Sequence, residues 1–276
     1  MSYTPVMAWA RVGTVDLYYE LGGRQEGPRV LYISGTGGDL RARPGPFDSM
    51  LPSRIRLLAY DQRGLGQSSV PPGPYTMTDY ADDAAALLDH VGWEEAAVVG
   101  VSFGGMVAQE LALRHPRKVR KLVLACTSSG GAGGSSYPLH ELANLSPGER
   151  AVRILELADT RMDSEWRAGN AAIWERAVAE AQARAKVGID NPDRQLGAEL
   201  QLEARKGHDT WQHLASIDCP TLVCGGLFDG ISPPANLERL AAAIRGARLR
   251  FFEGGHLFLQ QVPAAYREIV DFILDE

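Results

Sequence analysis

The stretch VVGVSFGGMVAQEL, from Val98 to Leu111, constrains the fold of this chain more than any other. An apolar run ends in Gly-Val-Ser-Phe-Gly, and a helical pattern follows at once. A strand that turns directly into a helix leaves little room at the bend, so a glycine on each side of the serine avoids collisions between Cβ atoms and neighbouring backbone. The amino end of the helix also favours negative charge beside the serine. The pattern is typical of a nucleophile elbow that exposes Ser102 on a strained turn; the alternative is a tight turn with an incidental serine.

The rest of the chain alternates short apolar runs with longer helical patterns. This alternation is typical of an α/β fold, with a mostly parallel sheet and helices on both faces. Several runs are continuously apolar, as expected for strands covered on both sides. The expected strands are Asp16–Leu21, Val30–Ser34, Ile55–Tyr60, Ala96–Val101, Lys121–Ala125, Thr221–Cys224 and Arg248–Phe252. The expected helices are Asp79–Val91, with Thr78 as its N-cap and Gly92 at its end, Gly104–Arg114, Ala235–Arg245 and Pro263–Asp275.

One interval, residues 127–208, contains no convincing strand. It opens with TSSGGAGGSSYP, which is expected to be a flexible connection. Helices are expected behind it, near Pro147–Asp159, Ser164–Lys186 and Pro192–Lys206. An all-helical insertion between two parallel strands is expected to cover the carboxyl ends of the strands, where open α/β sheets bind ligands. We therefore predict a core made of residues 1–126 and 209–276, with a helical cap made of residues 127–208.

Composition and charge argue against several classes of function. A net charge of −6 provides no basic surface for nucleic acid or for anionic membranes. No apolar run approaches the roughly 18 residues of a membrane-spanning helix, and the first residues lack the pattern of a secretory signal, so a cytoplasmic protein is expected. The three cysteines, Cys126, Cys219 and Cys224, have no metal-ligand spacing. We expect inert thiols and no metal site, and the sequence does not indicate an oligomeric state.

A serine hydroxyl is a poor nucleophile at neutral pH and needs a base. Among the six histidines, His256 is the best candidate, because its segment FFEGGHLFLQ directly follows the last predicted strand. That loop is expected to open at the same edge of the sheet as Ser102. The alternative for His256 is a packed or solvated histidine. The other histidines lie at the ends of surface helices, or in and just after the insertion: His90, His115, His140, His208 and His213.

The base in turn needs a carboxylate that fixes its tautomer. Asp229, in LVCGGLFDGISPP, comes just after the predicted strand Thr221–Cys224 and so reaches the same edge. Its alternative role is to form the turn before Pro233. We expect Ser102, Asp229 and His256 to meet as a catalytic triad.

Acyl transfer also requires donors for the developing oxyanion. One expected donor is the backbone N–H of Phe103, the residue after the serine. The other is the N–H of Thr36, in the loop LYISGTGGDL, whose glycines let backbone approach a substrate; the alternative is a plain glycine-rich turn.

Contacts with the substrate are harder to assign. The candidate substrate-binding residues are Gly35, Gly37, Met106, Trp166 and Trp174. The alternative for the tryptophans, Trp211 included, is to pack the insertion against the core. Two further side chains, Arg41 and Arg43, either recognise a substrate carboxylate or are solvated surface arginines.

These motifs together resemble the α/β-hydrolase superfamily over nearly the full chain. The resemblance rests on GVSFGG, GLFDGISP and GGH in this order, and on YDQRGLGQSS, which is similar to the family's D-x-R-G-x-G-x-S segment. Within the superfamily the chain is most similar to small serine esterases and enol-lactonases. The resemblance implies about eight strands, a helical lid, no cofactor, and turn-fixing roles for Asp61, Arg63 and Gly64. One departure is Ser34-Gly35, where many members have His-Gly.

The predicted function is a serine hydrolase that cleaves a carboxylic ester or lactone of a small molecule through an acyl-enzyme. A second possibility uses the same triad for C–C bond hydrolysis or for a cofactor-free haloperoxidase or perhydrolase reaction. A third is a non-catalytic ligand-binding protein built on a hydrolase fold. A serine nucleophile argues against the dehalogenase and epoxide hydrolase branches, which attack with aspartate.

Overall fold

The computed structural model describes residues 5–142 and 144–275. They contain one eight-stranded sheet with the strand order β1-β2-β4-β3-β5-β6-β7-β8. Strands β2 to β4 and β1 to β2 pair antiparallel, whereas every other neighbouring pair is parallel. The strands are β1 Val6–Val12, β2 Val15–Gly23, β3 Arg29–Ile33, β4 Arg56–Tyr60, β5 Ala96–Val101, β6 Val119–Ala125, β7 Thr221–Gly226 and β8 Arg248–Phe252. The predicted sheet of about eight mostly parallel strands is confirmed.

Strand β1 is the strand that the sequence did not predict. It forms the edge of the sheet and pairs with β2 through a tight turn at Gly13, which has a φ of +56°. Its side chains Val6, Met7 and Trp9 are more than half exposed. Because so little of β1 is buried, its apolar pattern lacks the continuous runs of the inner strands.

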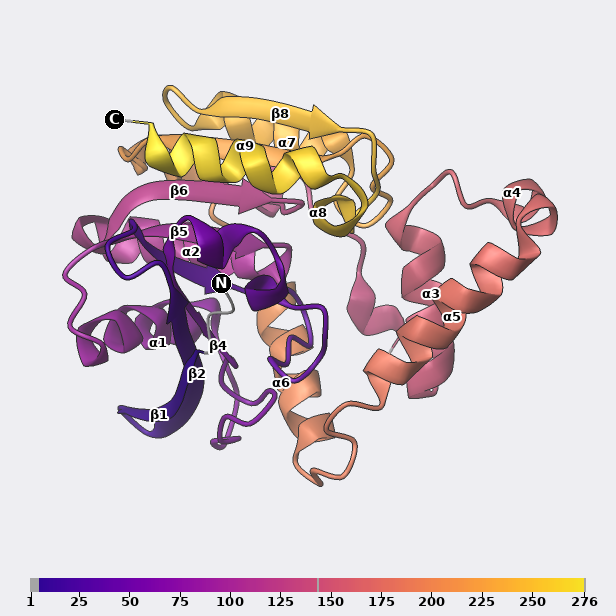
Figure 1. Ribbon diagram of the computed structural model, residues 1–276, viewed down its shortest axis with the longest axis horizontal. Helices are drawn as coiled ribbons and strands as arrows, with labels where there is room; N and C mark the ends of the chain where they lie inside the picture. Colours follow the sequence, from indigo (N-terminus) through magenta and orange to yellow (C-terminus); the bar gives the residue numbers. More distant parts are fainter. Residues whose placement is uncertain (1–4, 143, 276) are drawn as a thin grey trace.

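Helices cover both faces of the sheet (Figure 1). Helices α1 (Met77–His90), α2 (Phe103–Arg114) and α7 (Pro234–Ala243) contribute to one buried cluster with alternate residues of the strands. Helices α8 (Phe258–Gln261) and α9 (Pro263–Leu274) contribute to a second cluster on the opposite face. This double cover explains why β3, β5 and β7 are apolar at nearly every position.

The N-cap of α1 differs from the prediction of Thr78. The helix begins at Met77, and Thr76 Oγ1 accepts a hydrogen bond from the Asp79 amide. The Asp79 carboxylate accepts one from the Thr76 amide in return, which makes a capping box. This reciprocal pair fixes the start two residues earlier than predicted. Gly92, with a φ of +71°, follows the end of α1 as expected.

Four α-helices lie between β6 and β7 in the described chain. They are α3 Pro147–Ala158, α4 Ser164–Gly169, α5 Ala171–Ala185 and α6 Arg194–Lys206. The single predicted helix Ser164–Lys186 is wrong, because the chain leaves helical geometry at Asn170 (φ −129°, ψ 38°) and divides it into α4 and α5. Figure 1 shows α3, α4 and α5 as an arm (residues 147–185) directed away from the sheet, whereas α6 runs beside the core. None of the helices in the described ranges is long and apolar enough to span a bilayer.

The glycine-rich segment after β6 is packed, so the prediction of a flexible connection is wrong. Thr127, Ser128 and Ser129 are fully buried. A Cβ on Gly130, which has a φ of +71°, would lie 2.0 Å from the carbonyl oxygen of His208. The glycines here allow close backbone contact rather than mobility.

The segment after β4 ties two loops of the core together. The Asp61 carboxylate accepts hydrogen bonds from the amides of Leu40 and Gln67, at 2.7 and 2.8 Å, and burial raises the pKa of Asp61 to about 7. Arg63 makes a two-pronged ion pair with Asp83, with both N–O distances at 2.7 Å. These contacts fix the loops that follow β3 and β4, in agreement with the turn-fixing roles implied for Asp61 and Arg63.

Candidate active site

The serine elbow lies at the junction of β5 and α2. Ser102 has a φ of 55° and a ψ of −116°, a strained conformation for a residue with a side chain. A Cβ on Gly100 would lie 2.4 Å from the carbonyl oxygen of Gly104, and one on Gly104 would lie 2.0 Å from that of Ile33. Both glycines are therefore required by close backbone contacts around the bend.

Gly104→Ala is expected to lower the free energy of unfolding by about 3 kcal/mol, because the new methyl group collides with rigid backbone. The measurement is urea unfolding followed by circular dichroism. A matched control is Gly148→Ala in α3, where the nearest atom, on Gln182, is 3.7 Å away and the change is expected to be neutral or slightly stabilising, since alanine is the better helix former. Equal midpoints for Gly104→Ala and the unaltered protein would contradict the close contact.

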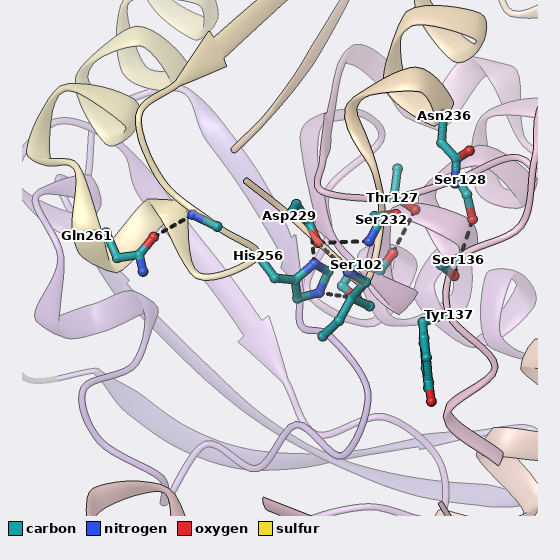
Figure 2. Close-up of polar contacts among 12 residues, drawn as sticks. Ser102, Thr127, Ser128, Ser136, Tyr137, Asp229, Ser232, Asn236, His256 and Gln261 are labelled. Atoms are coloured by element: carbon teal, nitrogen blue, oxygen red, sulfur yellow. Dashed lines mark hydrogen bonds and ion pairs between the residues drawn. The ribbon is translucent and has the colours of Figure 1, made fainter. Parts of the chain in front are cut away.

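The structure brings the three predicted triad side chains together. His256 Nε2 lies 2.9 Å from Ser102 Oγ, and His256 Nδ1 lies 2.7 Å from Asp229 Oδ2. Figure 2 shows the imidazole between the carboxylate and the hydroxyl. A carboxylate oxygen facing Nδ1 holds the proton there, so the Nε2 lone pair faces the serine hydroxyl.

The surroundings of Asp229 fix its orientation. The residue is 2 % exposed, and the second carboxylate oxygen, Oδ1, accepts hydrogen bonds from the amides of Ile231 and Ser232, both at 2.8 Å. The loop therefore holds Oδ1, and Oδ2 is left for the histidine. Because Asp229 follows β7, His256 follows β8 and Ser102 follows β5, the parallel strands deliver all three residues to one edge of the sheet.

The end of α3 and the two residues after it lie between the loops that carry Asp229 and His256. The carbonyl of Leu157 accepts a hydrogen bond from the Gly230 amide, and the carbonyl of Ala158 accepts one from the His256 amide. The Thr160 amide donates to the Phe228 carbonyl at 2.9 Å. We call residues 157–160 the wedge segment. It links the arm directly to the backbone on which Asp229 and His256 are mounted.

Two supporting side chains were missed by sequence reasoning. Thr127 Oγ1 donates to the carbonyl of Ser102 at 2.8 Å, and Gln261 Oε1 accepts from the amide of Gly255, the residue before His256, at 2.7 Å. Figure 2 shows both contacts on either side of the triad. Neither residue belongs to a motif, so no signal in a single sequence distinguishes it.

The two amides predicted to hold an oxyanion have no partner in the described chain. Phe103 is the first residue of α2, so its N–H has no intrahelical acceptor, and the Thr36 N–H makes no hydrogen bond there either. A Cβ built on Gly35 would lie 3.3 Å from the Cβ of Ser102, so this loop passes close to the serine. The Gly37 amide, in contrast, donates to Gln201 Oε1 at 2.8 Å and is not free.

At the Ser34-Gly35 departure, Gln62 contacts both the backbone and the side chain of Ser34. Its Nε2 donates to the carbonyl oxygen of Ser34 at 2.9 Å and lies 3.4 Å from Ser34 Oγ. This side chain, fully buried after β4, holds the loop that carries the Thr36 amide.

The candidate substrate-binding residues lie in different places. Met106 is buried beside the elbow and lines a small cavity, and Trp166 borders a separate hollow with Asp159 and Arg161. The guanidinium of Arg167 lies 5.2 Å from the ring centre of Trp174, on the arm.

Other candidate side chains make contacts within the protein itself. Trp211 packs against the core, and Arg41 and Arg43 form ion pairs with Asp39 and Asp48 at 2.6 and 3.2 Å. Both arginines are thus paired with carboxylates of the protein itself.

One cluster has ligand atoms that could approach a metal. A sulfur, an oxygen and a nitrogen of Cys126, Asp229 and His256 lie within 4.8 Å of one another. Both ring nitrogens of His256 already have partners, however, and burial raises the pKa of the Cys126 thiol well above its usual range. A protonated thiol is a poor metal ligand, so the chemistry of this set does not favour a metal.

Comparison with known families gives one clear match. A sequence model of the family described as "alpha/beta hydrolase fold" matches residues 28–261. A poly(3-hydroxyalkanoate) depolymerase from Ectopseudomonas oleovorans is 31% identical over 232 residues, which cover 83% of this chain and 78% of that protein.

Solved structures agree with this match. An enol-lactonase from Burkholderia xenovorans LB400 superposes with a TM-score of 0.79 at 25% identity, covering 97% of this chain and all of the other. A hydrolase from Pseudomonas aeruginosa PA01 superposes with a TM-score of 0.76 at 31% identity, covering 98% of each chain. The similarity therefore extends over both the core and the helices between β6 and β7.

Proposed function

Because the chain belongs to the α/β hydrolase family, we propose that it is a serine hydrolase that cleaves a carboxylic ester or lactone of a small molecule. The observation that carries the proposal is the continuous chain of hydrogen bonds from Asp229 through His256 to Ser102, which stands on a strained turn. A buried carboxylate, an oriented imidazole and a partly buried hydroxyl at these distances are the parts that nucleophilic acyl transfer needs.

In the proposed mechanism Ser102 Oγ attacks the substrate carbonyl while its proton moves to His256 Nε2. The carbonyl oxygen becomes an oxyanion, held by the amides of Phe103 and Thr36. The imidazolium, stabilised by Asp229, then gives its proton to the leaving alkoxide, and an acyl-enzyme remains. His256 next takes a proton from water, the hydroxide attacks the acyl carbonyl, and the acid leaves as the proton returns to Ser102. No step of this proposed cycle calls for a cofactor or a metal.

We further propose that residues 127–208 act as a cap over this edge of the sheet, with residues 1–126 and 209–276 as the core. The wedge segment supports this proposal, because it contacts the loops of both Asp229 and His256. The boundary is less sharp than these ranges suggest, since α6 lies against the core: a Cβ on Gly197 would lie 1.7 Å from the carbonyl oxygen of Gly64.

A fluorophosphonate probe is expected to label the folded protein once, at Ser102, because only an activated serine reacts quickly with it. Mass spectrometry of the peptide that contains residues 100–104 measures the label, and heat-unfolded protein is the control that should not react. A panel of p-nitrophenyl esters, lactones and dienone-type C–C substrates then identifies the bond that is cleaved. Absence of labelling would favour a non-catalytic binding protein, and turnover of dienones alone would favour C–C hydrolysis.

A further inference from the structure

A cavity of about 120 Å³ lies next to the elbow, outside the triad. Residues from α2, from the packed segment after β6 and from the end of α6 line it, among them Met106, Ser128, Ser136, Arg205, Lys206 and His208. Figure 2 shows Ser128 and Ser136 on the side of Ser102 opposite Gln261. The lining is therefore rich in hydrogen-bond donors and positive charge, and no acidic side chain of the described residues is part of it.

Arg205 is the unusual member of this lining. Its side chain belongs to a residue that is only 7 % exposed, yet no carboxylate in the described ranges lies within ion-pair distance of it. Nη2 donates to Ser136 Oγ and to the Tyr137 carbonyl, at 2.7 and 2.8 Å, whereas the buried Nε has no partner. Burial lowers the pKa of Arg205 to about 10, so the guanidinium still carries its charge at neutral pH.

Arg63 offers a comparison, because its side chain is also poorly exposed but pairs with the Asp83 carboxylate at 2.7 Å. A buried guanidinium without an anion is costly, because desolvation is not compensated by attraction. The charge of Arg205 thus has no counterpart among the carboxylates of the described chain.

His208 adds a second polar atom without a partner. The residue is 6 % exposed, and its Nε2 lies 3.2 Å from the carbonyl oxygen of Ser128, so Nε2 carries the proton in the neutral ring. Nδ1 has no hydrogen bond in the described chain. Arg205 and His208 thus each have one buried polar atom without a hydrogen bond in the described chain.

The cavity adjoins the elbow that carries Ser102. The Met106 amide donates to the carbonyl oxygen of Ser102, and Met106 lines the cavity. On α6, Gln201 holds the Gly37 amide of the oxyanion loop, and Arg205 follows four residues later, or about 6 Å along the helix axis. The same helix thus borders both the oxyanion loop and the cavity.

We propose that this cavity binds a carboxylate carried by the substrate, so that the natural substrate is an anionic ester or lactone anchored by Arg205. Both hydrogens of Nη2 are already donated within the chain, whereas Nη1 makes no hydrogen bond in the described chain and can donate to a carboxylate with a charge-assisted bond. Lys206, which also borders the cavity, is paired with Glu203 at 3.2 Å, so Arg205 supplies the uncompensated charge. The inference rests on the proposed hydrolase function, because the carboxylate that binds in the cavity belongs to the same substrate whose carbonyl carbon Ser102 attacks.

The test compares two esters of equal length: mono-p-nitrophenyl glutarate, which carries a carboxylate, and the p-nitrophenyl ester of glutaric acid monoamide, which is neutral. Arg205→Gln is expected to lose about 30-fold more kcat/KM on the carboxylate ester than on the amide ester, mainly through KM. Arg205→Lys should recover part of that difference, since it restores the charge without the planar fork. The matched control is Arg194→Gln on the same helix, outside the cavity, which should affect both esters equally.

Equal losses on the two esters would overturn the proposal, because they indicate that Arg205 only holds the Ser136–Tyr137 backbone. Inhibition by free glutarate that does not compete with the carboxylate ester would also overturn it, by indicating a separate anion site.

A binding measurement separates this inference from the proposed function. Calorimetric titration of Ser102→Ala protein with monomethyl glutarate should give binding that Arg205→Gln weakens by a similar factor. If the unaltered protein hydrolyses neither ester while this Arg205-dependent binding persists, the hydrolase proposal fails and the anion site stands. Absence of binding to Ser102→Ala protein contradicts the anion site, whatever the esters show.

Discussion

Replacement of Ser102 by alanine is expected to lower kcat for ester hydrolysis by about 10⁶, because no other group in the described site lies in line with His256 Nε2. The fold should persist, since alanine has the same Cβ as serine and meets no new atom at the elbow. The measurement is the initial rate on a p-nitrophenyl ester at saturating concentration. Activity above the uncatalysed rate is expected to remain, because the Phe103 and Thr36 amides still bind the oxyanion.

Ser129→Ala is the matched control for this variant. Ser129 is also fully buried and near the same edge of the sheet, but its hydroxyl contacts only the carbonyl of Gly130, at 3.2 Å. Its kcat should stay within about threefold of the unaltered value. If Ser102→Ala keeps the unaltered rate, or if Ser129→Ala loses as much, the assignment of Ser102 as the nucleophile is wrong.

Replacement of Asp229 by asparagine is expected to lower kcat by about 10⁴ with little change in KM. The amide oxygen of the new side chain must face the Ile231 and Ser232 amides, because both are donors fixed by the loop. The NH₂ group then faces His256 Nδ1, which is forced to accept, so the ring proton moves to Nε2. An imidazole protonated at Nε2 cannot take the proton of Ser102.

This tautomer argument has its own test. In Asp229→Asn the rate of fluorophosphonate labelling should fall in parallel with kcat, since both reactions need the same base. Ser232→Ala is the control, because it keeps the backbone amide that holds Asp229 and removes only a hydroxyl that has no partner in the described chain. A tenfold or smaller loss of kcat in Asp229→Asn would show that the carboxylate does not set the tautomer.

The candidate site could be predicted from the sequence because each of its three residues comes soon after a strand. Parallel strands bring their carboxyl ends to one edge, so Ser102, Asp229 and His256 can be placed near each other without knowledge of distances. The elbow glycines add a steric signal. In the structure, a Cβ on Gly100 or on Gly104 would collide with a backbone carbonyl oxygen, as the sequence pattern suggests.

Features that depend on contacts between residues could not be predicted from the sequence in the same way. Strand β1 is an exposed edge with weak patterning, and the true cap of α1, Thr76, is distinguished from Thr78 only by its reciprocal bond with Asp79. The importance of Arg205 lies in the missing carboxylate around it within the described chain. A sequence gives the charges but does not say which of them lack a neighbour.

The wedge segment has a consequence for how a substrate can enter. Residues 157–160 share hydrogen bonds with the loops of Asp229 and His256, so pulling this stretch outward would take the base away from the acid. The arm is thus connected directly to the loops of Asp229 and His256. We expect a substrate to enter and leave without withdrawal of residues 157–160, because that movement would break these hydrogen bonds and disturb the arrangement of the acid and the base.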